Sequence, residues 1–428
     1  MKTSPTTSLK ILNAALILAV ALFTGCGQTT TGPNTGSNAG PNVSTATPTP
    51  QAQFQEITLE GIEKEEVATT ISSRMAAAAP SRPLTGKFSE FSLPQDAFPQ
   101  LMTTAPDGSI YYAQGKANKI GHVPAAAFEG GKLKVRDFPV PTANSFPQAV
   151  VVGPDGNVWF TEKTGHQIGR LDPKTGKINE FKTPTANSGP VGITVGPDNN
   201  IWFTEAEANK IGRLDPNSPD TIQEFSIPTA NSAPIYIAAG PDRALWFVEV
   251  LGHKLGRIDP GTGQITEFPT KTPKSGPTSL VVGSDGAIWV SELNVDKIAR
   301  FDVNRKAFTE EVPINSRKNG PRSGPGILVN GPDGNIWFTE MYGNQIGRLN
   351  PTTKEIQEFS APSAVKLQAA AAPRANNSAA AAWRDANVAN TQALAPTGGP
   401  GGIVFGRDGS VWYTAMFSNK LARLQTSR

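Results

Sequence analysis

One phrase recurs seven times along this chain, and the repetition restricts the fold more than any other feature. Its clearest copy, GPDNNIWFTEAEANKIGR, runs from Gly196 to Arg213. The first six copies are about 43 to 48 residues apart, which indicates an array of structural repeats. The copies are marked by the aspartates Asp107, Asp155, Asp198, Asp242, Asp285, Asp333 and Asp408.

Each repeat reads as four short strands separated by turns. The strand Ile201–Glu205, rich in β-branched and aromatic residues, follows a turn of Gly, Pro, Asp and Asn. Four strands in about 43 residues form one blade, so the sequence predicts an all-β, seven-bladed β-propeller of four-stranded blades over residues 86–428. The four strands around the clearest copy are Ile178–Phe181, Val191–Val195, Ile201–Glu205 and Lys210–Leu214.

The two ends of the repeat region predict how the ring closes. The last unit stops at Arg428 after three strands, while Phe88–Leu93 reads as a fourth strand with no blade before it. We expect Phe88–Leu93 to pair with Leu421–Gln425 and to place Glu90 beside Arg423. Closure of this kind removes two open sheet edges.

The same reasoning predicts ion pairs within the blades. The third strand of most units ends in Arg, and the fourth carries an acid. Reflecting each hairpin through its turn places these charges opposite one another, where they would stabilise the blade. The expected pairs are Arg170–Glu180 and Arg257–Glu267, with His122–Asp137 in the first blade.

The N-terminus reads as a secretion signal over residues 1–25. Lys2 and Lys10 precede an apolar core, Ile11–Phe23, that is too short to span a bilayer. The core ends in Leu-Phe-Thr-Gly-Cys, which resembles a bacterial lipobox. We therefore expect lipid on Cys26, the single cysteine, and a propeller anchored to a membrane of the bacterial cell envelope, outside the cytoplasm.

Three further segments differ from the repeats. Residues 26–53 are rich in Thr, Pro, Gly and Ser and predict a flexible tether. Residues 54–85 form an N-terminal extension that is expected to be partly ordered, either with a short helix around Gly61–Ser73 or packed loosely on the propeller. The Ala- and Asn-rich insertion at residues 363–397 interrupts the last unit and is expected to be disordered.

Composition excludes several function classes. The formal net charge is +3 and falls to about +1 without the leader, so no basic face predicts nucleic-acid binding. The three histidines are scattered, and the chain has no Ser/His/Asp set, phosphate loop or Cys/His metal spacing. The residues themselves therefore predict no catalytic side chain and no metal site.

Two rings of positions are expected at one mouth of the central channel. Five repeated glutamates either hold a cation or serve their own blades, and the second is favoured because a metal site needs different ligands from different blades. The glutamate ring is Glu162, Glu205, Glu249, Glu292 and Glu340, with Gln114 and Ala415 where the pattern breaks. The other ring follows the proline that opens each inner strand: Gln100, Gln148, Val191, Ile235, Thr278, Gly326 and Gly401.

Positions where the units differ are the candidates for ligand recognition. Tyr236 offers an apolar face and a hydroxyl, although it could equally pack between blades. The candidate ligand-binding residues at the mouth are Gln100, Gln148, Ile235, Tyr236 and Met341.

The sequence of the repeat resembles that of a known family. The segments GPDGNIWFTE, GNQIGRL, IQEF, PTANSGPVGIT and ANKIGRL are similar to the virginiamycin B lyase, or streptogramin B lyase, family over about Gly86 to Leu424. The resemblance implies a seven-bladed propeller. It also implies a magnesium-assisted elimination that linearises a cyclic depsipeptide antibiotic, with a histidine as the base.

The catalytic set that the resemblance implies is missing from this chain. Gly399 and Gly401 stand where the family has a metal-binding Glu and the His base, and Met416 stands at the second metal-binding Glu. Substrate-contacting His and Tyr are replaced by Gly326 and Gln100. We therefore predict no cofactor, with Mg²⁺ needed only if lyase activity persists.

Three functions remain open. The first is a lipid-anchored, non-catalytic propeller that binds a small ligand or a protein partner at its channel mouth. The second is a streptogramin B lyase-like or lactonase-like enzyme that uses other residues. The third is a purely structural envelope protein, since fold alone does not fix function.

Overall fold

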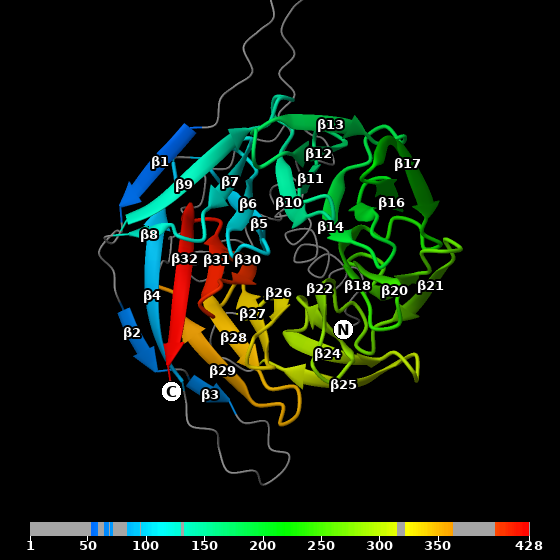
Figure 1. Cartoon of the computed structure of the whole chain (residues 1–428). Coiled ribbons are helices and arrows are strands. Elements are labelled where there is room, and N and C mark those ends of the chain that lie inside the picture. The colour runs from blue at the N-terminus through cyan, green and yellow to red at the C-terminus, as the bar shows by residue number, and fades with distance from the viewer. Residues whose placement is uncertain are drawn as a thin grey trace, which may run out of the picture.

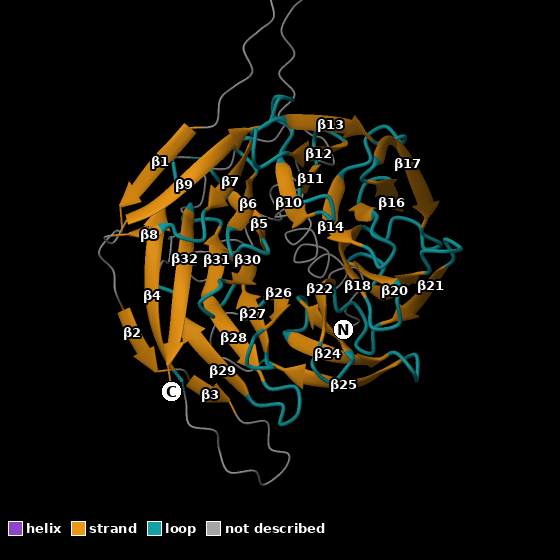
Figure 2. Ribbon diagram, in the orientation of Figure 1, coloured by secondary structure: helices purple, strands orange, loops and turns teal. Residues whose placement is uncertain are grey.

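Seven antiparallel sheets stand around a central channel as the blades of a propeller (Figure 1). The computed structural model describes residues 53–58, 64–67, 69–71, 84–94, 96–129, 132–314, 322–362 and 399–427. Within these ranges the chain forms strands and loops but no helix (Figure 2). The predicted all-β, seven-bladed propeller is confirmed.

Blades 2 to 5 each contain four strands, ordered outward from the channel. Blade 2 has β10 Pro147–Val152, β11 Val158–Glu162, β12 Gln167–Leu171 and β13 Ile178–Lys182. Blade 3 has β14 Pro190–Val195, β15 Ile201–Glu205, β16 Lys210–Asp215 and β17 Ser218–Ser226. Blade 4 has β18 Pro234–Ala239, β19 Leu245–Glu249, β20 Lys254–Ile258 and β21 Ile265–Pro269. Blade 5 has β22 Pro277–Val282, β23 Ile288–Glu292, β24 Lys297–Asp302 and β25 Ala307–Pro313.

Blades 6, 7 and 1 carry additional outer strands from the N-terminal extension. Blade 6 has β26 Pro325–Asn330, β27 Ile336–Glu340, β28 Gln345–Leu349 and β29 Ile356–Ser360, with β3 Thr69–Ile71 outside. Blade 7 has β30 Pro400–Phe405, β31 Val411–Ala415, β32 Lys420–Ser427 and β4 Thr85–Ser92, with β2 Lys64–Val67 outside. Blade 1 has β5 Pro99–Thr104, β6 Ile110–Gln114, β7 Lys119–Val123 and β9 Lys132–Pro139, with β8 Phe128–Glu129 and β1 Gln53–Thr58 on β9.

In blades 3 to 6, the aspartate of the turn before the second strand joins three parts of its blade. In blade 4, Asp242 accepts hydrogen bonds from the Trp246 indole at 2.9 Å and from Arg257 Nε at 2.6 Å. The turn, the second strand and the third strand are thereby held together. The same tryptophan stacks on Phe268 of the outer strand, with ring centroids 5.7 Å apart.

In blades 1 to 4 and 6, the glycine in the middle of the third strand makes room for an aromatic ring of the second strand. A Cβ on Gly169 would lie 2.0 Å from the Phe160 ring, and one on Gly256 would lie 2.1 Å from the Phe247 ring. Both rings are fully buried. These blades use glycine because the ring on the second strand covers the backbone of the third, whereas blade 5 pairs Ala299 with Val290 and blade 7 pairs Ala422 with Tyr413.

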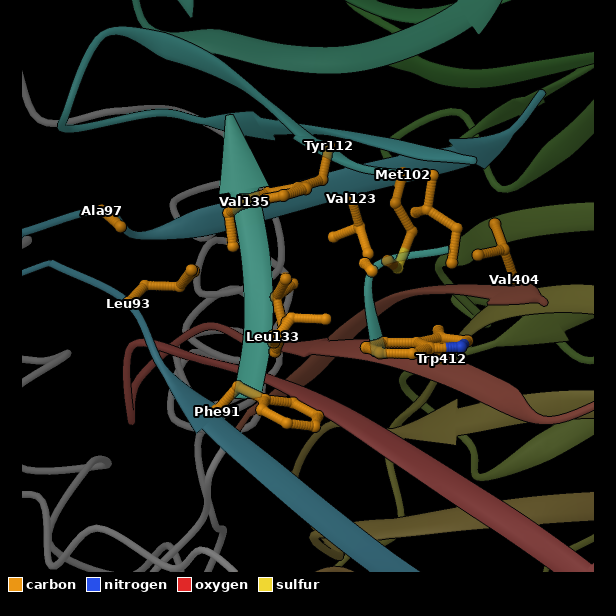
Figure 3. Packing of buried hydrophobic residues seen from close by; sticks show 13 residues of the cluster. Phe91, Leu93, Ala97, Met102, Tyr112, Val123, Leu133, Val135, Val404 and Trp412 are labelled. Atoms are coloured by element: carbon orange, nitrogen blue, oxygen red, sulfur yellow. The ribbon is translucent and has the colours of Figure 1, made fainter. Parts of the chain in front are cut away.

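The predicted closure of the ring is confirmed. Strand β4 pairs with β32 along its whole length, and Phe91 stacks on Trp412 at 5.8 Å as Phe268 does on Trp246. Figure 3 shows Phe91 and Leu93 packed with Trp412 and Leu133 in the core between blades 7 and 1. The first described strand of the repeat region thus completes the last blade.

The predicted register of the ion pairs is wrong by one residue. Arg170 lies opposite Asn179, while Glu180 lies opposite Gly169 and so on the other face of the sheet. Six residues, from Asp172 to Lys177, form the connecting turn and shift the pairing. The same shift places His122 opposite Arg136, Arg257 opposite Thr266 and Glu90 opposite Ala422.

The N-terminal extension forms strands, so a helix around Gly61–Ser73 is wrong. Strands β2 and β3 lie in that range and pair with β4 and β29, while β1 pairs with β9. The extension therefore covers the outer edges of three neighbouring blades (Figure 1). The signal, Cys26, the tether before Gln53 and the insertion at 363–397 lie outside the described residues. Among the described residues, no helix has the length and apolar character to cross a bilayer.

Candidate functional site

The two predicted rings meet at one mouth of the channel. The first residue of an inner strand pairs with the last residue of the second strand, as Pro147 does with Glu162 and Pro325 with Glu340. The residues after the prolines and the repeated glutamates therefore share one end of the barrel of inner strands. The structure places both rings where the sequence predicted them.

An apolar cluster lies on the mouth side of blades 5, 6 and 7. Met341, one of the predicted ligand residues, packs with Leu293, Tyr342 and Met416, and Phe98 lies against them. Gln100, another predicted residue, donates from Nε2 to the Phe98 carbonyl at 3.3 Å and lies 3.7 Å from Met416 Sδ. The structure thus brings Gln100 and Met341 to the same cluster.

Tyr236 and Ile235 do not join that cluster. Ile235 is buried against Val191 and Val250 of neighbouring strands. The half-buried Tyr236 lines a cavity of about 60 Å³ inside the channel, together with Leu101, Ile193 and Ile403 among others. These two residues lie along β18 and pack on adjacent blades.

The repeated glutamates are buried and face a second acid of their own blade. Burial, followed by the charge of Glu224, raises the pKa of Glu205 to about 8, so Glu205 is protonated at neutral pH. Burial opposes ionisation of Glu224 too, but bonds from Lys210 Nζ at 2.6 Å and from the Thr185 backbone N–H at 2.8 Å hold its pKa below the ordinary value. Glu205 and Glu224 therefore form an acid–carboxylate pair.

This arrangement recurs around blades 2 to 5. In each, a threonine in the loop that enters the blade donates to the glutamate of the outer strand. Burial raises the pKa of Glu162 and Glu249 to about 8 and that of Glu292 to about 7. The glutamate of the outer strand thus connects the loop that enters the blade to the blade itself, and the repeated glutamate is buried beside it. The loop–acid pairs are Thr142–Glu180, Thr185–Glu224, Thr229–Glu267 and Thr272–Glu311.

The match to a known protein family covers most of the propeller. The sequence profile described as the virginiamycin B lyase family matches residues 129–365, which is more than half of the chain. The chain belongs to the virginiamycin B lyase family. No curated protein gives a significant match.

Solved structures of virginiamycin B lyases share the fold over nearly their whole length. A streptogramin B lyase structure superposes with a TM-score of 0.64 at 32% identity, covering 80% of this chain and 98% of that one. Selenomethionine-substituted virginiamycin B lyase from Staphylococcus aureus gives 0.63 at 32% identity, covering 79% and 99%. A catalytically inactive histidine-to-alanine variant from S. aureus, solved with quinupristin, gives 0.64 at 31%, covering 79% and 99%.

Neighbouring side chains close around the positions that the resemblance assigns to the family's base and metal ligands. Gly399 has a positive φ of 63°, and a Cβ there would lie 2.2 Å from the Phe417 ring. A Cβ on Gly401 would lie 2.9 Å from Met416 Sδ, and one on Gly326 would lie 3.1 Å from Met341 Cγ. Larger side chains at these three glycines would require their neighbours to move.

The residues present do not fit the magnesium ion that the family implies. Mg²⁺ binds oxygen ligands, and Gly399, Gly401 and Met416 offer no side-chain oxygen. In the part of the chain that the structure describes, no three His, Cys, Asp or Glu side chains converge as a metal site requires.

One residue at the mouth was missed by the sequence reasoning. Lys163 follows Glu162 directly, and its side chain is only 1% exposed. Burial, opposed by the charge of Glu207, lowers the pKa of Lys163 to about 8. The signal was readable, because the residues that follow the other six copies of the second strand are uncharged: Gly115, Ala206, Val250, Leu293, Met341 and Met416.

Proposed function

We propose that this chain is a lipid-anchored propeller of the cell envelope that binds a ligand or partner at its channel mouth and does not carry out the family's elimination. The observation that carries the proposal is the filled space around Gly399 and Gly401. A Cβ on Gly399 would lie 2.2 Å from the Phe417 ring and one on Gly401 would lie 2.9 Å from Met416 Sδ, so a Glu and a His there would require these side chains to move.

Elimination depends on groups that this mouth does not supply in the family's positions. A base must reach the proton that it removes, and a metal needs charged or imidazole ligands. In the S. aureus relative, a single histidine-to-alanine variant is catalytically inactive. This chain replaces the base, both metal-binding acids and a second His together.

Mass spectrometry of quinupristin incubated with the full chain, with and without Mg²⁺, tests the absence of catalysis. We expect no linear product, while S. aureus virginiamycin B lyase serves as the positive control. Linear product that increases in proportion to protein concentration would instead support a lyase that uses other residues.

Ligand binding at the mouth is supported by the residues that differ between blades. Gln100 and Met341 meet in the apolar cluster, whereas most second-strand and turn positions repeat. A fragment screen by thermal shift, repeated with Gln100→Ala, Gln148→Ala and Tyr236→Ala, locates the site. Hits that bind all three variants as they bind wild type would move the site away from the mouth.

The lipid anchor is supported by the sequence of residues 1–26. Several acyl chains hold a protein firmly on a bilayer, whereas an unmodified leader would be removed. Cell fractionation of wild type and Cys26→Ser tests the anchor, with wild type expected in the membrane fraction and the variant released. Equal solubility of the two proteins would reject it.

A further inference from the structure

Two polar side chains in blade 2 are buried without hydrogen-bond partners. Both amide atoms of Gln148 lack a partner, and the residue is 0% exposed. Lys163 Nζ also makes no hydrogen bond. Its ion-pair contact is with Glu207 Oε1 at 3.7 Å. The Glu207 carboxylate is 46% exposed, and its hydration weakens the ion pair.

The repeat indicates that these two buried side chains lie next to each other at the mouth end of blade 2. In blade 7, the equivalents of Gln148 and Lys163 are Gly401 and Met416, and a Cβ on the glycine would lie 2.9 Å from Met416 Sδ. In blade 6 the equivalent residues are Gly326 and Met341, and a Cβ on the glycine would lie 3.1 Å from Met341 Cγ. Equivalent positions on equivalent strands place the Gln148 and Lys163 stems side by side.

Lys163 is the single cation in a ring that is otherwise uncharged. Its equivalents Val250, Leu293, Met341 and Met416 are buried and apolar. A buried ammonium without close partners costs several kcal/mol of desolvation, and apolar replacements of similar volume commonly stabilise such sites. The blade could have used methionine here, as blades 6 and 7 do, so Lys163 serves something other than packing.

We propose that Lys163 and Gln148 form a subsite that binds the carboxylate of an otherwise apolar ligand at the channel mouth. This assignment rests on the proposed ligand-binding function and names the chemistry of the ligand. The Lys163 ammonium and the Gln148 amide N–H match the two oxygens of one carboxylate. A phosphate or sulfate has more acceptor oxygens and is typically matched by Arg forks or several backbone amides.

The apolar part of the ligand would lie against the other residues of the ring. Val250, Leu293, Met341 and Met416 supply this surface, and methionine adapts to ligands of irregular shape. The Gln148 carbonyl oxygen remains free to accept from an amide or hydroxyl near the carboxylate. The site therefore favours a monoanionic acid, such as an aryl or acyl carboxylate, over its neutral derivatives.

A matched pair of probes tests the carboxylate. Calorimetric titration of the full chain compares 4-phenylbutyrate with its neutral amide, 4-phenylbutyramide. We expect the acid to bind about 10- to 100-fold more tightly, as one charge-assisted hydrogen bond would give. The preference should vanish in Lys163→Met, shrink in Gln148→Met and persist in the exposed-site control Lys174→Met. No preference in wild type, with or without binding of the amide, overturns the assignment.

A second measurement does not depend on the probe. Thermal melting without ligand should show Lys163→Met at least as stable as wild type, because methionine removes a buried charge whose contact with the half-exposed Glu207 is weak. A marked fall in Tm would show that Lys163 holds the blade together and would overturn the assignment. If both probes bind Lys163→Met normally but fail to bind Gln100→Ala, the mouth binds ligands and only the carboxylate subsite is rejected.

Discussion

Blades 2 to 5 and blades 6, 7 and 1 are built from the same repeat but differ at the outer edge of the sheet and at the channel mouth. In blades 2 to 5 a loop threonine donates to the outer glutamate, and the outer strand forms the edge of the sheet. In blades 6, 7 and 1 the outer edges carry β3, β2 and β1, and methionines close the mouth over Gly326 and Gly401. The three blades around the ring closure are thus those with added outer strands, and two of them have methionines over the mouth glycines.

Removal of the closing strand, β4, should produce the largest loss of stability. Deleting residues 1–94 removes β4, whose Phe88 and Phe91 are fully buried, and should abolish cooperative folding of the ring. Deleting residues 1–83 removes only β1, β2 and β3 and should leave a folded propeller with a lower Tm. Melting followed by circular dichroism distinguishes them, and identical Tm values would show that β4 is not the clasp.

The buried tryptophans offer the next comparison. Trp246→Ala should cost about 3–5 kcal/mol, because the ring is almost fully buried and its N–H is bonded to Asp242. Trp412→Ala should cost less, because Trp412 borders a cavity of about 300 Å³ that Val123, Leu133 and Arg407 also line. Urea unfolding of both variants measures the difference. Equal losses would mean that blades 4 and 7 are equally well packed.

The paired acids predict a pH dependence in the regular blades. The pKa of Glu205 is about 8 in the fold and near 4.5 when unfolded, so the folded state binds the extra proton between these values. Stability should therefore fall as pH rises from about 5 to 9. Glu205→Gln should match wild type near pH 5 and exceed it by about 1–2 kcal/mol at pH 9.

Glu224→Gln is the matched control for that experiment. It removes the ionised partner that accepts from Lys210 and Thr185, so it should destabilise the protein at neutral pH. A wild-type stability that rises between pH 5 and 9 would contradict the acid–carboxylate pair.

The smallest expected effect concerns the register of the blades. A double-mutant cycle between Arg257 and Asp242 should give a coupling of about 0.2–1 kcal/mol, since both side chains are about one-quarter exposed. The cycle between Arg257 and Glu267 should give a coupling near zero, because the two lie on opposite faces of blade 4. The reverse order would restore the pairing that the sequence suggested.

The fold and its closure could be predicted because the repeat carries its own turns and strand patterns. Phe88–Leu93 was identifiable as a fourth strand since every other blade already had one. The register was missed because it depends on how six residues between Leu171 and Ile178 turn, which residue types alone do not fix. Strands β2 and β3 were missed because they lie outside the repeat, so no repeated pattern identifies their partners in β4 and β29.

The sequence predicted where the candidate site lies better than it predicted which residues form it. The prolines and the repeated glutamates located the mouth correctly, and Gln100 and Met341 meet there. Tyr236 instead lines the cavity inside the channel and also packs against the hydrophobic cluster that contains Ile235. Lys163 was overlooked although it is the charged exception at its position in the repeat, and its burial depends on packing between blades.

The path of the N-terminal extension also determines how the ring would respond to mechanical load. A pull on Gln53 acts along β1, whose six residues pair with β9 and would have to slip together in shear. Strands β2 and β3 follow in series before the chain reaches β4. Tension arriving from the N-terminal side would therefore be borne by blades 1, 7 and 6 in turn, and the closing strand would be the last to feel it.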